Sequence, residues 1–198
     1  MIKEATAKPT KSERTRADIL AAAQDLFANL GYENATIRDI AAKASIDPAM
    51  VIRYFGSKDE LFARAAAIEL RLPPLTSIDG DQIGEVLIRH FLEIWESAES
   101  ATGMAIMLRS ATSNEFAAAK MRDIFAGQVG PAIAKIGSRA TAAQRAGLVS
   151  SQLLGLALCR YVLKLPPVVA MSRNEIITHV GPTLQRYATG AGATGTQP

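Results

Sequence analysis

The chain has 198 residues, of which 48% are apolar, 21% charged and only 6% aromatic. This length and composition allow a substantial buried core, which excludes an intrinsically disordered protein, and the absence of alternating apolar and polar residues predicts an all-α fold. The net charge of +3 is too small to indicate a nucleic-acid partner by itself.

Membrane and metal-binding classes are also excluded. No apolar run approaches the roughly 20 residues that span a bilayer, and the first sixteen residues lack the apolar stretch of a secretory signal. Cys159 is the only cysteine, so neither an intrachain disulfide nor a cysteine cluster for zinc is possible. We therefore expect a cytoplasmic protein that holds no metal and no other cofactor.

The first predicted helix follows a basic arm, residues 1–16. Two threonines, Thr10 and Thr15, compete for its start, because each is followed three residues later by a carboxylate that can complete a capping box. Apolar residues then recur at helical spacing until Gly31, which supplies the left-handed residue that commonly ends a helix.

Two short helices are predicted next, over 36–44 and 48–55. Asp47 can cap the second of them, with Pro48 at the first helical position, where its missing N–H costs nothing. Two short helices joined by a tight turn beneath a longer helix form a helix-turn-helix, whose second helix enters the major groove of DNA.

A fourth helix is expected over 57–70, and the segment LPPLTSIDGD after it cannot continue a helix. This segment marks the predicted domain boundary. We assign residues 1–72 to the arm and helix-turn-helix domain, 73–189 to a second helical domain and 190–198 to a Gly/Thr-rich tail that should be disordered.

The second domain carries several apolar stripes at helical spacing. The stripes begin at Ile83, Met104 and Phe116, and the pair Gly130-Pro131 should interrupt the last of them. A long helix is then predicted from about Thr141 to Leu165. The final helix begins after Ser172, and Pro182 should kink or restart it.

The segment ATIRDIAAKASIDPAMVIRYFGSKDELF resembles the DNA-binding signature of the tetracycline-repressor (TetR/AcrR) family of bacterial regulators. The most specific elements are Thr36, Ile40-Ala41, Tyr54-Phe55 and Ser57-Lys58. The family usually has glycine where Ser45 stands, and a small residue and an aromatic where Met50 and Ile52 stand. The aromatic commonly contacts phosphate, so Ile52 is expected either to touch a thymine methyl or to pack within the protein.

The exposed face of the helix over 48–55 should carry the base contacts, because Val51 and Phe55 are spaced to face the core. Arg53 is its one side chain able to pair bidentately with guanine. Phosphate contacts are expected from Thr36, Tyr54 and Lys58. The complete set of expected DNA-binding residues is Arg16, Thr36, Ser45, Pro48, Ala49, Met50, Arg53, Tyr54 and Lys58.

The C-terminal half is also similar to this family, which implies a homodimer built on the last two long helices. Gly155 and its small neighbours would suit close helix packing, and a two-fold dimer with recognition helices about 34–36 Å apart would bind a near-palindromic operator. The residues expected at the dimer interface are Leu148, Gln152, Gly155, Leu156, Ile177 and Leu184.

The remaining helices would enclose a pocket for a small, largely apolar effector that releases the DNA. The residues expected to line it are Trp95, Met104, Met107, Leu108, Phe116, Met121, Phe125 and Tyr161. Arg109 and Arg160 lie within apolar helices, where they could bind an acidic ligand group or pair with internal carboxylates.

Two other functions compete with a ligand-responsive repressor. An enzyme is disfavoured, because His90 and His179 are the only histidines and no catalytic or metal-ligand spacing occurs; His90 is better explained as a hydrogen-bonded core residue. The second alternative is a ligand-binding protein that has lost DNA recognition, which Met50 and Ile52 would suggest.

Overall fold

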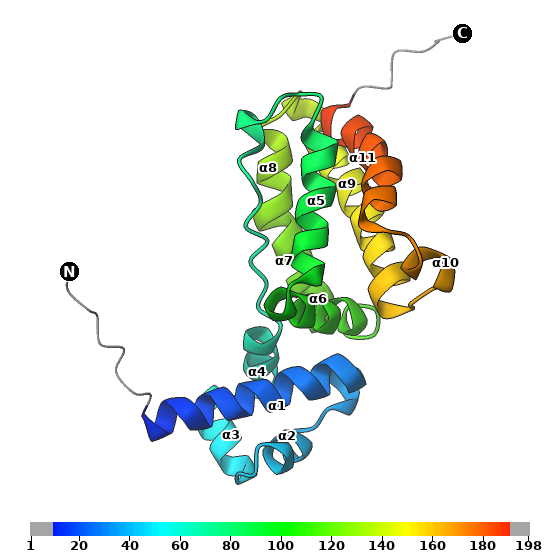
Figure 1. Cartoon of the computed structure of the whole chain (residues 1–198). Coiled ribbons are helices and arrows are strands. Elements are labelled where there is room, and N and C mark those ends of the chain that lie inside the picture. The colour runs from blue at the N-terminus through cyan, green and yellow to red at the C-terminus, as the bar shows by residue number, and fades with distance from the viewer. Residues whose placement is uncertain (1–9, 191–198) are drawn as a thin grey trace, which may run out of the picture. The chain divides into compact units, whose positions relative to one another are not determined.

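The computed structural model describes residues 10–190 (Figure 1). The N-terminal part of the basic arm, up to residue 9, and the tail from residue 191 lie outside the described residues. Within them every regular element is a helix, and none is long and apolar enough to cross a membrane. The chain divides into two compact units, Met1–Ala67 and Ile68–Pro198.

The first unit contains four helices. They are α1 (Lys11–Asn34), α2 (Ile37–Lys43), α3 (Pro48–Phe55) and α4 (Lys58–Ala65). Of the two possible starts of α1, the structure uses Thr10, whose hydroxyl and backbone form a capping box with Glu13. Gly31 interrupts the regular helix at φ +76°, a left-handed conformation that glycine adopts without steric cost.

The core of this unit is formed where α1 packs against α2 and α4, and α3 packs against its two neighbours. Phe27 of α1 and Phe62 of α4 are fully buried, with ring centroids 5.1 Å apart and nearly perpendicular planes. Ile40 of α2 and Val51 of α3 are equally buried. This packing fixes the two short helices, and therefore which face of α3 remains exposed.

Helix α4 is shorter than predicted, since it ends at Ala65 and not at Leu70. The backbone that follows forms tertiary hydrogen bonds in place of helical ones. The side-chain amide of Gln128 accepts from Leu70 N at 2.7 Å and donates to Ile68 O at 3.1 Å. His90 Nε2 lies 2.6 Å from the carbonyl oxygen of Leu70. Residues 66–74, here called the connector, therefore run in a non-helical conformation.

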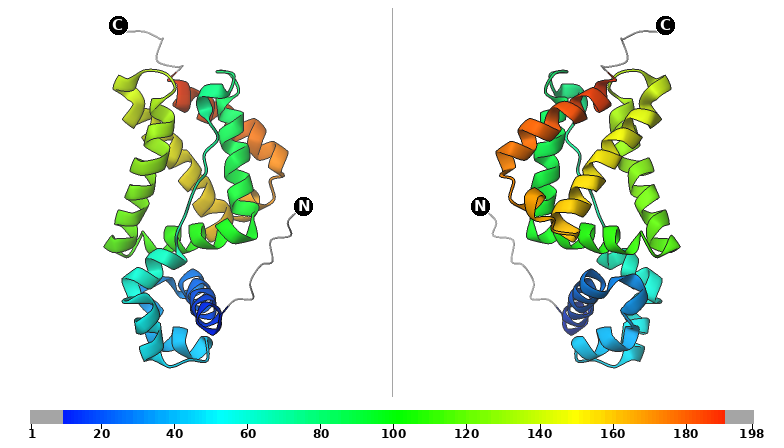
Figure 2. Two further views of the ribbon diagram at one scale, coloured as in Figure 1. Left: turned by 90° about the vertical axis from the view of Figure 1, so that its left-hand side faces the viewer. Right: turned by 90° about the vertical axis from the view of Figure 1, so that its right-hand side faces the viewer.

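The second unit is a helical bundle (Figures 1 and 2). Its α-helices are α5 (Ile83–Glu96), α6 (Ala98–Ser110), α7 (Glu115–Ile124), α8 (Gly130–Ala134), α9 (Ala142–Ala157), α10 (Pro166–Val169) and α11 (Arg173–Thr189). Short 3-10 turns lie at Leu75–Ser77 and Arg139–Thr141, and π-helical turns at Phe125–Val129 and Leu158–Val162.

The prediction that Gly130-Pro131 interrupts a helix is wrong, because the chain stays helical through this pair. A π-helical turn, Phe125–Val129, joins α7 directly to α8, and Pro131 lies in the first turn of α8. Proline is compatible with a first turn, because the N–H groups there have no intrahelical acceptor. Helix α11 likewise continues through Pro182.

Helices α5 and α11 pack more closely than any other pair in this unit. A Cβ atom at Gly84 would lie only 2.2 Å from the carbonyl oxygen of Gly181, so the approach requires glycine at this point. At the C-terminal end of α11, the buried guanidinium of Arg145 donates to the carbonyl oxygens of Ala188 and Ser138. The positive charge of Arg145 thereby meets the C-terminal end of a helix, where a cation is favoured.

Candidate functional site

The first candidate site is the exposed face of α3. Val51 and Phe55 are buried in the core of the first unit, as their spacing predicts. Pro48, Ala49 and Arg53 are exposed, whereas Met50 and Tyr54 are half-buried. The structure therefore leaves Arg53 accessible on a short helix of helix-turn-helix arrangement, with the four-residue turn 44–47 before it.

Ile52 belongs to the same face, and two roles were expected for it: contact with a thymine methyl or packing within the protein. Its side chain is 45% exposed, which leaves it accessible for the first of these roles. A large apolar side chain beside an arginine offers van der Waals contact to a thymine methyl group. The predicted exposed face did not include Ile52, although its position one turn after Pro48 could have indicated this exposure.

Two aromatic side chains of this unit hold basic residues in cation–π contacts. The Arg16 guanidinium of α1 lies over the Tyr54 ring, 5.5 Å from its centroid. The Lys58 ammonium lies 4.3 Å from the centroid of Tyr32 and donates to the carbonyl oxygen of Glu33 at 3.4 Å. Since an ammonium has three donors, this arrangement orients Lys58 without using its whole donor capacity.

Tyr32 stays a neutral phenol under Lys58. Burial, with the hydrogen bond that the phenol donates to Asp59 as a second cause, raises the pKa of Tyr32 to about 12. The ring therefore presents an uncharged π face to the ammonium group. Tyr32 was not among the predicted site residues, and its role in positioning Lys58 emerges only from the folded chain.

Thr36 is fully used as a helix cap. Its hydroxyl accepts from Asp39 N at 3.1 Å and donates to Asp39 Oδ2 at 2.6 Å, and its own N–H also meets that carboxylate. The hydroxyl donor is thus not available for phosphate unless the Asp39 bond is broken. The N–H groups of the first turn of α2 remain the simpler donors at this position.

Ser45 lies in the turn between α2 and α3 at φ +55°. Left-handed backbone is unfavourable for residues with a side chain, which explains why a glycine suits this position. Ser45 is exposed, and its conformation sets the turn that presents the N-terminus of α3.

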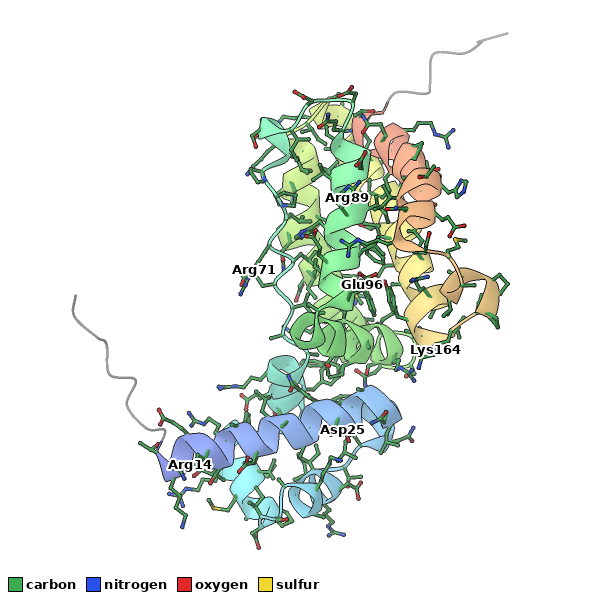
Figure 3. The ribbon with its side chains drawn as sticks, in the orientation of Figure 1. Arg14, Asp25, Arg71, Arg89, Glu96 and Lys164 are labelled. Atoms are coloured by element: carbon green, nitrogen blue, oxygen red, sulfur yellow. The ribbon has the colours of Figure 1, made fainter. Side chains whose placement is uncertain are left out.

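The first unit has almost no net charge, so any basic surface on it depends on where individual side chains lie. Residues 1–67 contain ten lysine and arginine residues against nine acidic ones. Several acids are used inside the unit: Asp25, labelled in Figure 3, pairs with Lys43 at 2.7 Å, and Asp47 accepts from Ala49 N at 2.7 Å. Phosphate contact would therefore depend on the positions of Arg16, Arg53 and Lys58 more than on overall charge.

The second candidate site is an apolar cavity of about 70 Å³ inside the second unit. Helices α5, α6, α7, α8 and α9 contribute its wall, together with the π-helical turn Phe125–Val129 and the connector residues Leu70 and Leu72. The only lining side chains with polar atoms are His90, Trp95 and Ser150, and none of the lining residues is a carboxylate, lysine or arginine.

Half of the predicted lining residues are on this wall. Trp95, Met104, Met121 and Phe125 line the cavity. The other four do not: Met107, Leu108, Phe116 and Tyr161. Met107 and Leu108 are buried elsewhere in the core, Phe116 lies against Lys120, and Tyr161 stacks behind Trp95 with ring centroids 4.7 Å apart.

The two arginines considered for an acidic ligand do not reach the cavity. Arg109 is exposed, and Arg160 donates to the carbonyl oxygens of Val168, Val169 and Met171 around α10. The hydrogen bonds of Arg160 Nη1 thus go to backbone carbonyls and not to carboxylates. His90 is hydrogen-bonded, as predicted, and among the described residues no cluster of histidine, cysteine and acidic groups could hold a metal.

The third candidate site is the outer face of α9. Gly147, Leu148, Ser151 and Gly155 are exposed along it, with Gln152 and Leu156 half-buried beside them. A Cβ atom at Gly147 or Gly155 would meet no atom within 4 Å, so nothing within the described chain requires glycine there. Ile177 and Leu184, expected at the same interface, are instead buried in the unit's core, because that side of α11 packs against the rest of the bundle.

Sequence comparison covers both units. Residues 19–65 match the bacterial regulatory proteins of the tetR family, and residues 81–188 match the tetracyclin repressor-like C-terminal domain. An HTH-type transcriptional repressor of Mycobacterium tuberculosis is 49% identical over 53 residues, which are 27% of this chain and 28% of the relative. An HTH-type regulator of an Aromatoleum species is 35% identical over 60 residues, again about a quarter of its length.

Solved structures resemble nearly the whole chain. A TetR-family regulator from Streptomyces coelicolor is 28% identical, covering 93% of this chain and 99% of its own, with a TM-score of 0.61. NalD of Pseudomonas aeruginosa, the secondary repressor of a multidrug efflux pump, has the same fold at 21% identity, 89% and 97% coverage and a TM-score of 0.66.

Proposed function

Because the chain belongs to the tetracycline-repressor (TetR) family of bacterial regulators, we propose that it is a dimeric repressor that binds a near-palindromic operator and leaves it when a small molecule occupies the cavity. The observation that carries this proposal is the exposed face of α3, where Pro48, Ala49, Ile52 and Arg53 are accessible on the second helix of a helix-turn-helix.

This face would read bases by one polar and several apolar contacts. Arg53 would donate to guanine O6 and N7, and Ile52 would contact a thymine methyl group. Arg16, Tyr54 and Lys58, held by their cation–π contacts, would fix the register through the phosphates. Together they form a small reading surface, so a tight operator complex would need two copies.

The outer face of α9 would supply the contact between the copies. The exposed glycines Gly147 and Gly155 have open space where a Cβ would lie, which would let a second α9 approach closely, and the 39% exposed side chain of Leu148 would be buried by it. Glycine within a helix costs stability relative to alanine, so a partner helix would explain why two are kept on this face.

The cavity would hold the effector, and the connector would couple effector binding to the DNA-binding unit. Leu70 and Leu72 line the cavity, while Gln128 and His90 hold the connector backbone by hydrogen bonds. Since the cavity measures only about 70 Å³, most ligands would have to displace its wall. An effector releases DNA only if it binds more tightly to a conformer that fits the operator poorly.

Ligand binding has precedent in this fold. SmeT, the repressor of a Stenotrophomonas maltophilia multidrug efflux pump, has been solved as a complex with triclosan, and that chain shows 22% identity and a TM-score of 0.63 with this one. This similarity concerns the fold alone. The chemistry of the effector must be inferred from the residues that line this cavity.

Selection of random DNA duplexes by the purified protein tests the proposal. We expect recovery of a near-palindrome with two half-sites about one helical turn apart, bound more weakly as salt increases because counterions are released from contacted phosphates. Arg53→Ala should weaken binding of the selected duplex by about 1–3 kcal/mol and relax the sequence preference at one position of each half-site.

Matched variants separate base reading from general damage. Arg89→Ala removes an exposed helical arginine of the second unit and should leave operator affinity unchanged. Ile52→Ala should weaken operator binding, whereas Leu30→Ala removes an equally exposed side chain of α1 and should not. A folded dimer that enriches no sequence would instead support the ligand-binding protein that has lost DNA recognition.

A further inference from the structure

The wall of the cavity has no formal charge among its described side chains. It combines leucine, isoleucine, methionine and aromatic residues with only three side chains that carry polar atoms, His90, Trp95 and Ser150. A ligand ion placed there would lose its hydration without gaining a counterion, which is strongly unfavourable. The cavity therefore selects against carboxylates, phosphates and ammonium groups.

Trp95 lines the cavity and carries a buried hydrogen-bond donor without an acceptor among the described residues. The side chain is only 4% exposed, and its buried Nε1 has no acceptor among the described residues. One face of the indole ring is covered by Tyr161, which lies nearly parallel to it at an interplanar angle of 8°. Buried N–H groups are nearly always paired in folded proteins, so the unpaired Nε1 of this wall residue would gain an acceptor if a ligand displaced the wall and reached it.

The donor of His90 is already occupied, which leaves the indole as the distinctive polar feature of the wall. His90 Nε2 lies 2.6 Å from Leu70 O, and since a carbonyl oxygen only accepts, this nitrogen carries the proton. The bond is made to the connector and not to the cavity. Ser150 is half-buried, whereas the Trp95 indole combines near-complete burial with an unmet donor.

On these grounds, and resting on the proposed function, we propose that the effector is a compact, uncharged, mainly apolar molecule with one hydrogen-bond acceptor, which Trp95 Nε1 recognises. The volume of about 70 Å³ restricts the ligand to roughly one ring unless the wall moves. Met104 and Met121 give the wall side chains that can repack around such a ring.

Acetophenone, ethylbenzene and benzoate test this recognition, because they share a phenyl ring and differ in the acceptor and the charge. Trp95 is the only tryptophan of the chain, so its fluorescence and its single indole N–H resonance in a ¹H–¹⁵N spectrum both report on this site. Acetophenone should bind about threefold to tenfold more tightly than ethylbenzene, as expected for one net hydrogen bond, and should shift the indole resonance downfield. Benzoate should not bind.

Variants of the stacked pair make the test specific. Trp95→Phe keeps an aromatic ring but removes the donor, so calorimetry should give nearly equal affinities for acetophenone and ethylbenzene. Tyr161→Phe removes a hydroxyl behind the wall and should keep the preference for acetophenone. The indole resonance of the unmodified protein decides the matter even if Trp95→Phe fails to fold.

Three results would overturn the inference: no binding of acetophenone, equal affinities of the unmodified protein for acetophenone and ethylbenzene, or binding of benzoate in the cavity. Operator binding by the same preparation keeps this outcome separate from the proposed function. Protein that binds its selected duplex but not acetophenone contradicts only the ligand inference. Protein that binds acetophenone through Trp95 but no duplex contradicts only the repressor proposal.

Discussion

At the scale of single residues, the first unit combines helix caps that are satisfied internally with a few side chains left accessible. Thr36 and Asp47 have their side-chain oxygens occupied by backbone N–H groups, whereas Arg53 and Ile52 are exposed on α3. The division follows from geometry, because a cap must point at its own helix while a reading residue must point away from it.

Ser45 gives a prediction at this scale. Its backbone is left-handed at φ +55°, so Ser45→Gly should remove a steric cost and stabilise the first unit by about 0.5–1 kcal/mol, after allowance for the greater freedom of glycine in the unfolded chain. Urea unfolding measures the difference. Ser45→Ala retains a Cβ and should unfold close to the unmodified protein; a Ser45→Gly variant of lower stability would contradict this explanation.

At the scale of the helices, two elements have features that their own unit does not require. Helix α9 has exposed glycines with open space around them, and the π-helical turn Phe125–Val129 directs Gln128 to the connector while Phe125 and Val129 line the cavity. Turns of π-helix occur frequently at functional sites. Each feature supports a role outside the packing of the unit itself.

The glycines of α9 predict a specific effect on assembly. Gly155→Leu should weaken the dimer at least tenfold, because a side chain would separate the two helices, while each unit keeps its helical content. Analytical ultracentrifugation over a concentration series measures this. Gly127→Leu is the matched control, since Gly127 is also an exposed helical glycine with open space at its Cβ position. Equal dimer affinities of the two variants would place the interface elsewhere.

The hydrogen bonds of Gln128 lead to a prediction that separates effector binding from its effect on operator affinity. Gln128→Ala removes both hydrogen bonds to the connector, so the effector should still bind while its effect on operator affinity falls. Comparing operator affinity with and without saturating ligand measures this coupling. Gln185→Ala provides the control, because that amide similarly holds the backbone at Gly80 and Gly84, away from the connector. An unchanged coupling in Gln128→Ala would exclude this route.

At the scale of the whole molecule, the charge is nearly balanced, with 22 basic and 19 acidic side chains and only a small excess in the first unit. Operator affinity would therefore depend on where the few exposed cations lie and on the spacing of two copies. A regulator built in this way is sensitive to a small change of spacing, since both half-sites must be met together.

Linkage between the two ligands gives a prediction for the complete dimer. If acetophenone lowers operator affinity by some factor, saturating operator must lower acetophenone affinity by the same factor. Titrations followed by Trp95 fluorescence, with and without the selected duplex, measure the second factor independently. A factor of one in both titrations would show that the cavity and the operator site are not coupled.

The sequence by itself determined the helical class, the helix caps and the exposed face of α3. Thr36 and Asp47 cap N–H groups two or three residues away, and Pro48 and Gly31 act through their own backbone angles, so their effects are local and can be predicted from the sequence. The buried positions of Val51 and Phe55 follow in the same way from a period of 3.6 residues.

Only the tertiary structure decided what each apolar face covers. Helical spacing marked Trp95, Met107 and Ile177 alike as apolar, with the first two expected at the pocket and Ile177 at the dimer interface. The folded chain places Trp95 on the cavity wall and the other two in the core. The end of α4 was decided in the same way, by hydrogen bonds from Gln128 and His90, which are distant in sequence. The physical reason is that the hydrophobic effect is non-directional. An apolar stripe therefore predicts that a helix face is buried, but it does not predict whether that face packs in the core, lines a cavity or contacts a partner.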